Sequence, residues 1–100
     1  MVTWEFNFNT LFLPRQKIRK QLAALITRVQ QLGLAATDVA TVQEYLEYNE
    51  YGLCLGHIVT QLYEYEIPID NEFYHEVEKV AALMSFPEKE YNYIKELITM

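Results

Sequence analysis

The apolar residues of the first third of the chain recur with the period of an α-helix. The stripe consists of Ile18, Leu22, Leu25, Val29 and Leu32. Spacings of three and four residues place the whole stripe on one side of a helix. An apolar face of this length is stable only when other elements cover it, so the chain must supply further amphipathic segments that pack against it.

Capping residues predict the boundaries of the first two helices. Pro14 suits the first turn of the helix that carries the stripe, and Gly33 suits its C-terminal cap. We expect Thr37 or Asp38 to cap a second helix, because short oxygen-bearing side chains can accept a hydrogen bond from a free backbone N–H. The apolar face of this second helix consists of Val39, Val42, Tyr45 and Leu46.

The same signals predict three further helices. A break near Asn49 precedes a third helix over about residues 50–65. Asp70 is expected to cap a fourth helix, and the pair Ser85 and Glu88 has the spacing of a capping box at the start of a fifth. Connections of a few residues between such helices are typical of a compact bundle.

The first residues follow a different pattern. The segment from Trp4 to Phe8 alternates apolar and polar residues, as a strand does. Because no other strand is predicted, we interpret this segment as an arm packed on the helices. No linker interrupts residues 1–100, and 51% of the residues are hydrophobic, enough to build one core. The predicted fold is all-α, a single domain formed by a compact bundle of about five short helices with an extended N-terminal arm.

Residues that catalysis or metal binding requires are scarce. The chain has one cysteine, Cys54, and two histidines, His57 and His75. Cys54 and His57 are three positions apart, but two ligands do not complete a metal site. Neither histidine lies in a recognisable catalytic motif. We therefore predict that the protein is not an enzyme and that it binds neither a metal nor a cofactor.

Cysteine usage and hydropathy indicate a compartment. A single cysteine cannot form an internal disulfide, which fits a reducing environment. The first eight residues lack the basic and apolar regions of a signal peptide. No apolar run approaches the roughly 20 residues that span a bilayer. We therefore expect a cytoplasmic protein that does not associate with membranes.

Charge is distributed unevenly along the chain, whose net charge is −6. Residues 1–30 carry five basic residues and one acidic residue, a net charge of +4, whereas residues 31–100 carry three basic and thirteen acidic residues, a net charge of −10. An acidic body repels nucleic acid and attracts basic partners. We therefore expect a protein partner, while the basic residues of the first helix leave nucleic-acid binding as an alternative.

Tyrosine is frequent and is interleaved with acidic residues. The eight tyrosines are Tyr45, Tyr48, Tyr51, Tyr63, Tyr65, Tyr74, Tyr91 and Tyr93. Tyrosine rings give large contact areas, and carboxylates pair with lysine and arginine. The predicted binding surface for a basic protein consists of Glu47, Tyr48, Glu50, Tyr63, Glu64, Tyr65, Glu66, Asp70 and Glu72. The alternative interpretation is that these are solvated helix faces and that the tyrosines surround the core.

Two segments share their order and spacing with a known family. The first reads Glu50-Tyr51-Gly52-Leu53-Cys54-Leu55, and the second reads Gln61-Leu62-Tyr63-Glu64-Tyr65-Glu66-Ile67-Pro68-Ile69. They resemble the E-Y-G-L-A-L-E and D/Q-L-Y-E-Y-x-I-P-I elements of the MafI family and of related immunity proteins of contact-dependent growth inhibition, the CdiI type. The resemblance covers about residues 44–98. The sequence departs from the family at Cys54, where the family has alanine, and at Gly56, where it has glutamate.

This resemblance implies that the protein neutralises a cognate bacterial toxin by binding it directly. The expected partner is a basic toxin domain, a nuclease and specifically a ribonuclease, carried at the C-terminus of a large secreted effector. From the composition we further expect that a monomer of this chain forms a 1:1 complex and covers the basic active-site cleft with its acidic, tyrosine-rich face. The alternative is a helical adaptor or regulatory protein that binds a different basic protein.

Overall fold

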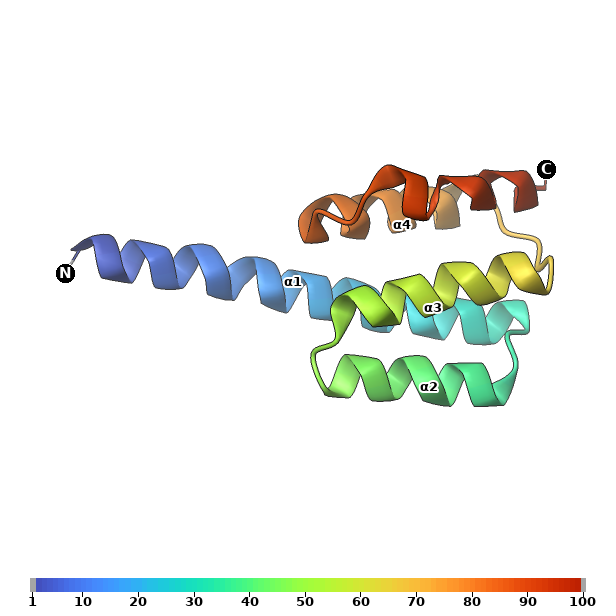
Figure 1. Cartoon of the computed structure of the whole chain (residues 1–100), viewed down its shortest axis with the longest axis horizontal. Coiled ribbons are helices and arrows are strands. Elements are labelled where there is room, and N and C mark those ends of the chain that lie inside the picture. Colours follow the sequence, from blue (N-terminus) through green and yellow to red (C-terminus); the bar gives the residue numbers. More distant parts are fainter. Residues whose placement is uncertain (1, 100) are drawn as a thin grey trace.

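The computed structural model describes the backbone of residues 2–99 and the side chains of residues 15–99. Four α-helices are followed by two short 3-10 helices (Figure 1). Their bounds are α1 Val2–Leu32, α2 Ala36–Glu47, α3 Tyr51–Glu64, α4 Asn71–Met84, η1 Glu88–Glu90 and η2 Asn92–Leu97. Within the described residues, extended pairing is limited to one bridge between Ile69 and Ile98. The prediction of an all-α bundle is confirmed.

The apolar stripe of α1 lies in the centre of the core. Ile18, Leu22, Leu25 and Val29 are buried, and Leu32 packs at the core's edge. The C-terminal half of α1 runs beside α2, α3 and α4 (Figure 1), and each of these helices contacts it. Burying one such side chain contributes about 1.5–3 kcal/mol, so this stripe organises the bundle.

The N-terminal segment differs from the expectation. α1 begins at Val2 and contains 31 residues, so the backbone before Pro14 continues the helix. The segment projects away from the bundle (Figure 1) instead of packing on the other helices, and it is helical and not extended. A helix satisfies most of its backbone hydrogen-bonding groups internally, whereas a lone strand leaves all of them to water.

Several helix boundaries agree with the sequence. Gly33 has a φ of 105° at the end of α1, a conformation that favours glycine. Asn49, with a φ of 61°, lies in the break between α2 and α3. The carboxylate of Asp70 accepts a hydrogen bond of 2.8 Å from the backbone N–H of Phe73 and caps α4.

The predicted cap of α2 is wrong. Ala35 precedes the helix and makes no side-chain capping bond, so neither Thr37 nor Asp38 is the cap. Asp38 lies in the first turn instead, where it contacts α3. Its Oδ1 atom is 2.9 Å from Nε2 of His57 and accepts a hydrogen bond of 3.1 Å from Gln61. The carboxylate of Asp38 therefore binds side chains of α3 instead of a backbone N–H at the start of α2.

The fifth helical segment also differs from the prediction. Ser85 adopts a left-handed conformation, with a φ of 56°, and ends α4 instead of opening a new helix. The N–H of Phe86 then donates to the carbonyl of Ala81 over 2.8 Å, which completes a Schellman-type ending. Beyond it, η1 and η2 are separated at Tyr91, whose φ is −139°, so no continuous α-helix forms.

Candidate protein-binding surface

All nine predicted binding residues are exposed, but they fall into three groups. The turn group is Glu47, Tyr48 and Glu50; the α3-end patch is Tyr63, Glu64, Tyr65 and Glu66; and the α4-start group is Asp70 and Glu72. The turn group and the α3-end patch lie at opposite ends of α3 (Figure 1), a helix of 14 residues. A helix of that length spans about 21 Å, so the three groups do not form one continuous cluster.

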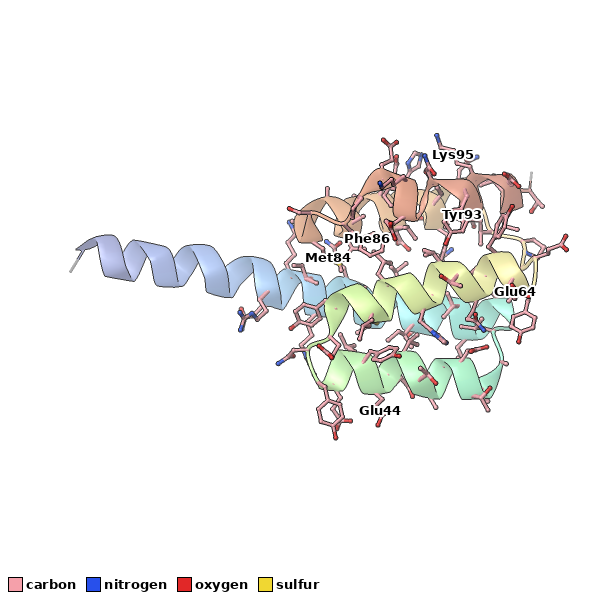
Figure 2. The ribbon with its side chains drawn as sticks, in the orientation of Figure 1. Glu44, Glu64, Met84, Phe86, Tyr93 and Lys95 are labelled. Atoms are coloured by element: carbon pink, nitrogen blue, oxygen red, sulfur yellow. The ribbon has the colours of Figure 1, made fainter. Side chains whose placement is uncertain are left out.

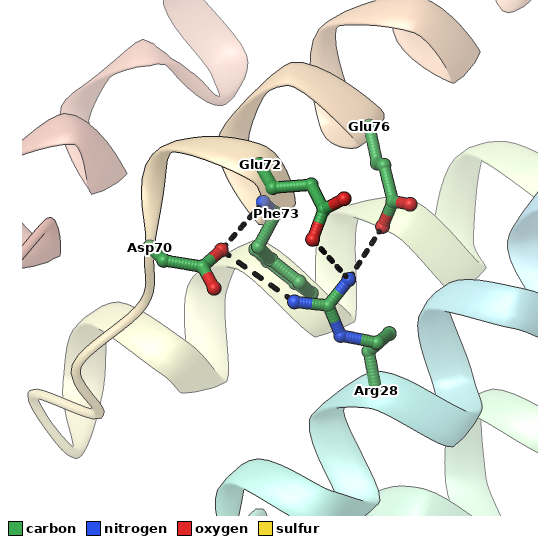
Figure 3. Close-up of polar contacts among 5 residues, drawn as sticks. All are labelled: Arg28, Asp70, Glu72, Phe73 and Glu76. Atoms are coloured by element: carbon green, nitrogen blue, oxygen red, sulfur yellow. Dashed lines mark hydrogen bonds and ion pairs between the residues drawn. The ribbon is translucent and has the colours of Figure 1, made fainter.

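The α4-start group is engaged within the fold. The guanidinium of Arg28 lies 3.5 Å from Asp70, 3.8 Å from Glu72 and 3.1 Å from Glu76 (Figure 3). It also lies over the ring of Phe73, 5.7 Å from the ring centroid. These contacts join α1 to the first half of α4. Both Asp70 and Glu72 therefore already have a cationic partner, which makes them weaker candidates for contacts with another protein.

The turn group also lies beside a cation of the fold. The Nη1 atom of Arg19 donates hydrogen bonds to the carbonyl of Leu46, over 2.8 Å, and to Oδ1 of Asn49, over 2.7 Å. The same Asn49 oxygen accepts a hydrogen bond of 3.1 Å from the hydroxyl of Tyr51. These contacts fix the turn between α2 and α3. Sequence reasoning did not identify the role of Arg19, because its partners are distant in sequence.

A shallow groove lies at the C-terminal end of α3. It is lined by Tyr63, Glu66, Glu96 and Leu97. The hydroxyl of Tyr63 donates a hydrogen bond of 3.1 Å to Glu96. The ring of Tyr63 meets the ring of Tyr93 edge to face, with centroids 4.9 Å apart. Figure 2 shows Tyr93 between the C-terminal segment and α3, so the groove is built where η2 packs against α3.

The carboxylates of Glu66 and Glu96 give this groove a negative charge. The pKa of Tyr63 is raised, first because its hydroxyl bonds the Glu96 carboxylate and then because of the charges of Glu96 and, more weakly, Glu66. Among residues 15–99, no basic side chain forms an ion pair with Glu66 or Glu96. Lys95 turns to the other side of η2 (Figure 2), where its Nζ atom lies 5.6 Å from the centroid of the Tyr74 ring.

Exposure separates the tyrosines into three sets, of which one, Tyr45, Tyr51 and Tyr93, is partly buried against the core. Tyr48, Tyr63 and Tyr65 expose 69%, 41% and 59% of their surface, respectively. Tyr74 and Tyr91 are buried in the core. The three exposed rings all belong to the predicted surface, and two of them stand in the α3-end patch. Large exposed rings beside carboxylates are typical of surfaces that bind other proteins.

Glu96 and Tyr93 belong beside the α3-end patch but were not predicted. Glu96 is 33 positions from its partner Tyr63, a separation that helical periodicity does not address. The sequence did contain a signal that could have identified them. Tyr93 and Glu96 are three positions apart, so they show the same interleaving of tyrosine with acidic residues that identified the other candidates. These two residues belong to η2 and lie next to the α3-end patch, so the candidate surface continues from the end of α3 onto η2.

The single cysteine is buried, and each histidine contacts a carboxylate. Cys54 is fully buried, and burial raises the pKa of its thiol to about 12, so the reactive thiolate is scarce at neutral pH. His57 contacts Asp38, and the Nδ1 atom of His75 lies 2.9 Å from Glu78. Across the part of the chain that the structure describes, no cluster of three or more His, Cys, Asp or Glu residues could hold a metal ion.

Comparisons of the chain with protein-family models, with curated proteins and with solved structures found no match. None of the helices in the described residues is both long and apolar enough to cross a membrane. The fold and its surface define a small acidic α-helical bundle. Its most distinctive exposed feature is the α3-end patch with its groove.

Proposed function

We propose that this protein is an immunity protein that binds and neutralises a cognate bacterial toxin. The observation that supports the proposal most strongly is the α3-end patch. Its tyrosine rings are exposed, and Glu66 pairs with no basic side chain among residues 15–99. Such a surface suits the lysine and arginine side chains of a basic partner. The resemblance of residues 44–98 to the MafI family supports a toxin as that partner.

In this proposal the acidic patch covers the basic active-site cleft of a nuclease toxin, which we expect to be a ribonuclease. A cleft that binds the phosphates of nucleic acid is rich in lysine and arginine. Carboxylates on the inhibitor compete for the same groups and exclude the substrate. Opposite charges accelerate the encounter and make it sensitive to salt. We expect a dissociation constant in the nanomolar range or below, about −12 kcal/mol, because residual free toxin would be lethal.

Interface geometry allows the separated groups to share one partner. A stable interface covers about 800 Å² on each protein, which corresponds to a patch roughly 30 Å across. The turn group and the α3-end patch are separated by the length of α3, about 21 Å, so a single toxin domain could reach both. The α3-end patch would be central because its acids have no cationic partner in the described part of the fold, and the turn group would add contacts at the rim.

Co-expression tests this proposal. The chain is produced together with the toxin domain encoded directly upstream of its gene, and growth and co-purification are measured. The proposal predicts restored growth and a 1:1 complex of two cytoplasmic proteins. A toxin that stays lethal and unbound, or the lack of any toxin gene at that position, would contradict it. The helical adaptor that binds a different basic protein would then be the better account.

A further inference from the structure

Arg28 shows how this fold holds a guanidinium group. Carboxylates approach it from Glu72 and Glu76 of α4 and from Asp70, which caps that helix, and the ring of Phe73 lies beneath it (Figure 3). A guanidinium is planar and directs its N–H donors outward, so several acceptors can surround its edge while an aromatic ring covers its face. The combination of carboxylates and one aromatic ring is therefore a suitable site for arginine.

The groove at the end of α3 has the same combination, and no cation from residues 15–99 pairs with its carboxylates. Its walls include the carboxylates of Glu66 and Glu96 and the ring of Tyr63. The ring of Tyr93 supports Tyr63 edge to face. Because Glu66 follows α3 and Glu96 belongs to η2, the two acids reach the groove from different elements. Within the described residues neither acid forms an ion pair.

We propose that this groove binds the side chain of a single arginine supplied by a protein partner. The guanidinium donates hydrogen bonds to Glu66 and Glu96, and one of its faces lies on the ring of Tyr63. Leu97 contacts the methylene groups of the arginine stem. This inference rests on the proposed function, because it names the side chain that the toxin inserts at the α3-end patch.

The groups in the groove favour arginine over lysine. Two carboxylates on separate elements can both be reached by the forked donors of a guanidinium, whereas an ammonium group is a compact point charge. A flat guanidinium also stacks on an aromatic ring. The carboxylates that raise the pKa of Tyr63 also attract any cation that enters the groove.

A nuclear magnetic resonance titration of the isolated chain tests the groove without any toxin. The probes are two short blocked peptides, acetyl-Gly-Arg-Gly-amide and acetyl-Gly-Lys-Gly-amide, added to the labelled protein. We expect saturable shift changes confined to residues 63–67 and 93–97, with affinity for the arginine peptide at least about threefold higher. Equal affinity for both peptides, or changes centred elsewhere, would overturn the inference.

Matched variants localise the binding. The pair Glu66→Gln and Glu96→Gln should weaken arginine-peptide binding about threefold to tenfold, because two exposed ion pairs are lost. The pair Glu88→Gln and Glu90→Gln changes the net charge equally on exposed residues of η1 and should change binding by less than about twofold. Equal effects of the two pairs would contradict a specific site. If circular dichroism shows that the double variant at Glu66 and Glu96 is unfolded, arginine-peptide binding is measured for the single variants Glu96→Gln and Tyr63→Leu.

The outcomes separate this inference from the proposed function. If the wild-type chain rescues growth against the toxin but binds both peptides alike, only the arginine site is wrong. If the groove prefers arginine but the toxin is neither bound nor neutralised, the immunity function is wrong, and the groove serves an arginine of another protein.

Discussion

The guanidinium of Arg28 lies 3.1 Å from the carboxylate of Glu76 and so joins α1 to α4 across 48 positions of sequence. The side chain of Arg28 is 26% exposed, which limits the screening of this contact by solvent. Asp70 and Glu72 approach the same group. One cation therefore balances three carboxylates where the two helices meet.

Replacing this cation should destabilise the fold. We expect Arg28→Gln to lower the free energy of unfolding by about 1–2 kcal/mol, because Asp70, Glu72 and Glu76 then repel one another without compensation. Urea denaturation measures the effect. Arg15→Gln removes an exposed charge from the same helix and should stay within about 0.5 kcal/mol of the wild type. Similar losses in both variants would contradict a specific role of Arg28.

A buried hydroxyl offers a stabilising change. Tyr74 is 3% exposed, and among the described residues its hydroxyl has no hydrogen-bond partner. Burying an unpaired polar group is unfavourable. We therefore expect Tyr74→Phe to raise the free energy of unfolding at pH 7 by about 1 kcal/mol, measured by urea denaturation. A clear loss of stability would show that the hydroxyl has a partner.

The same residue predicts how stability depends on pH. Burial raises the pKa of Tyr74 to about 12, whereas an unfolded tyrosine has a pKa of about 10. The folded protein keeps this proton longer than the unfolded chain does. The contribution of this pKa difference to the free energy of unfolding is fully present below about pH 10 and is lost as the pH rises toward about 12. Denaturation between pH 8 and pH 11.5 should show this loss, and Tyr74→Phe should reduce its slope. Tyr63 and Tyr91 also have raised pKa values. Equal slopes in the wild type and the variant would therefore show that these other tyrosines, and not Tyr74, cause the loss of stability.

Replacing either of two glycines by alanine should change the free energy of unfolding, with opposite signs at the two positions. Gly33 has a φ of 105°, so Gly33→Ala should lower the free energy of unfolding by about 1 kcal/mol. Gly56 lies inside α3, and a Cβ atom there would meet nothing within 4 Å. Gly56→Ala should therefore raise the free energy of unfolding by about 0.5–1 kcal/mol. Thermal denaturation compares the two variants, and the same sign in both would refute this account.

The fold was largely predictable because its signals are local. The stripe from Ile18 to Val29, the cap at Asp70 and the turn at Gly33 each depend on neighbouring residues, and all three agree with the structure. The errors came from one tertiary contact, at Asp38, and from one local helix ending, at Ser85. Asp38 binds His57 instead of capping α2, and the left-handed Ser85 ends α4 instead of starting an α-helix.

The candidate site was predictable in its exposure but not in its arrangement. Composition identified exposed residues, because acidic side chains are rarely buried and tyrosines next to them in sequence are often at the surface. It could not reveal that Asp70 pairs with Arg28, or that Glu96 meets Tyr63. Both contacts depend on how helices distant in sequence pack together, which the period of a single helix does not determine.

Charge reversal tests the proposed role of the α3-end patch in association. Glu64→Lys with Glu66→Lys should slow association with the toxin about tenfold or more at low salt, because the patch would then repel a basic cleft. Glu88→Lys with Glu90→Lys makes the same change in net charge on η1 and should have a smaller effect. Stopped-flow fluorescence measures both rates. If the first pair associates at the wild-type rate, the docking face lies elsewhere, for example on the basic first helix.

Neutralisation is tested most directly by a titration of the purified toxin domain with this protein while the toxin's cleavage of nucleic acid is followed. We expect complete inhibition at one equivalent of the wild-type chain. Inhibition by the Glu64→Lys and Glu66→Lys variant, which reverses the charge of the α3-end patch, should require a clear excess. Cleavage that continues unchanged with excess wild-type protein would contradict the claim that this bundle neutralises a toxin by binding it.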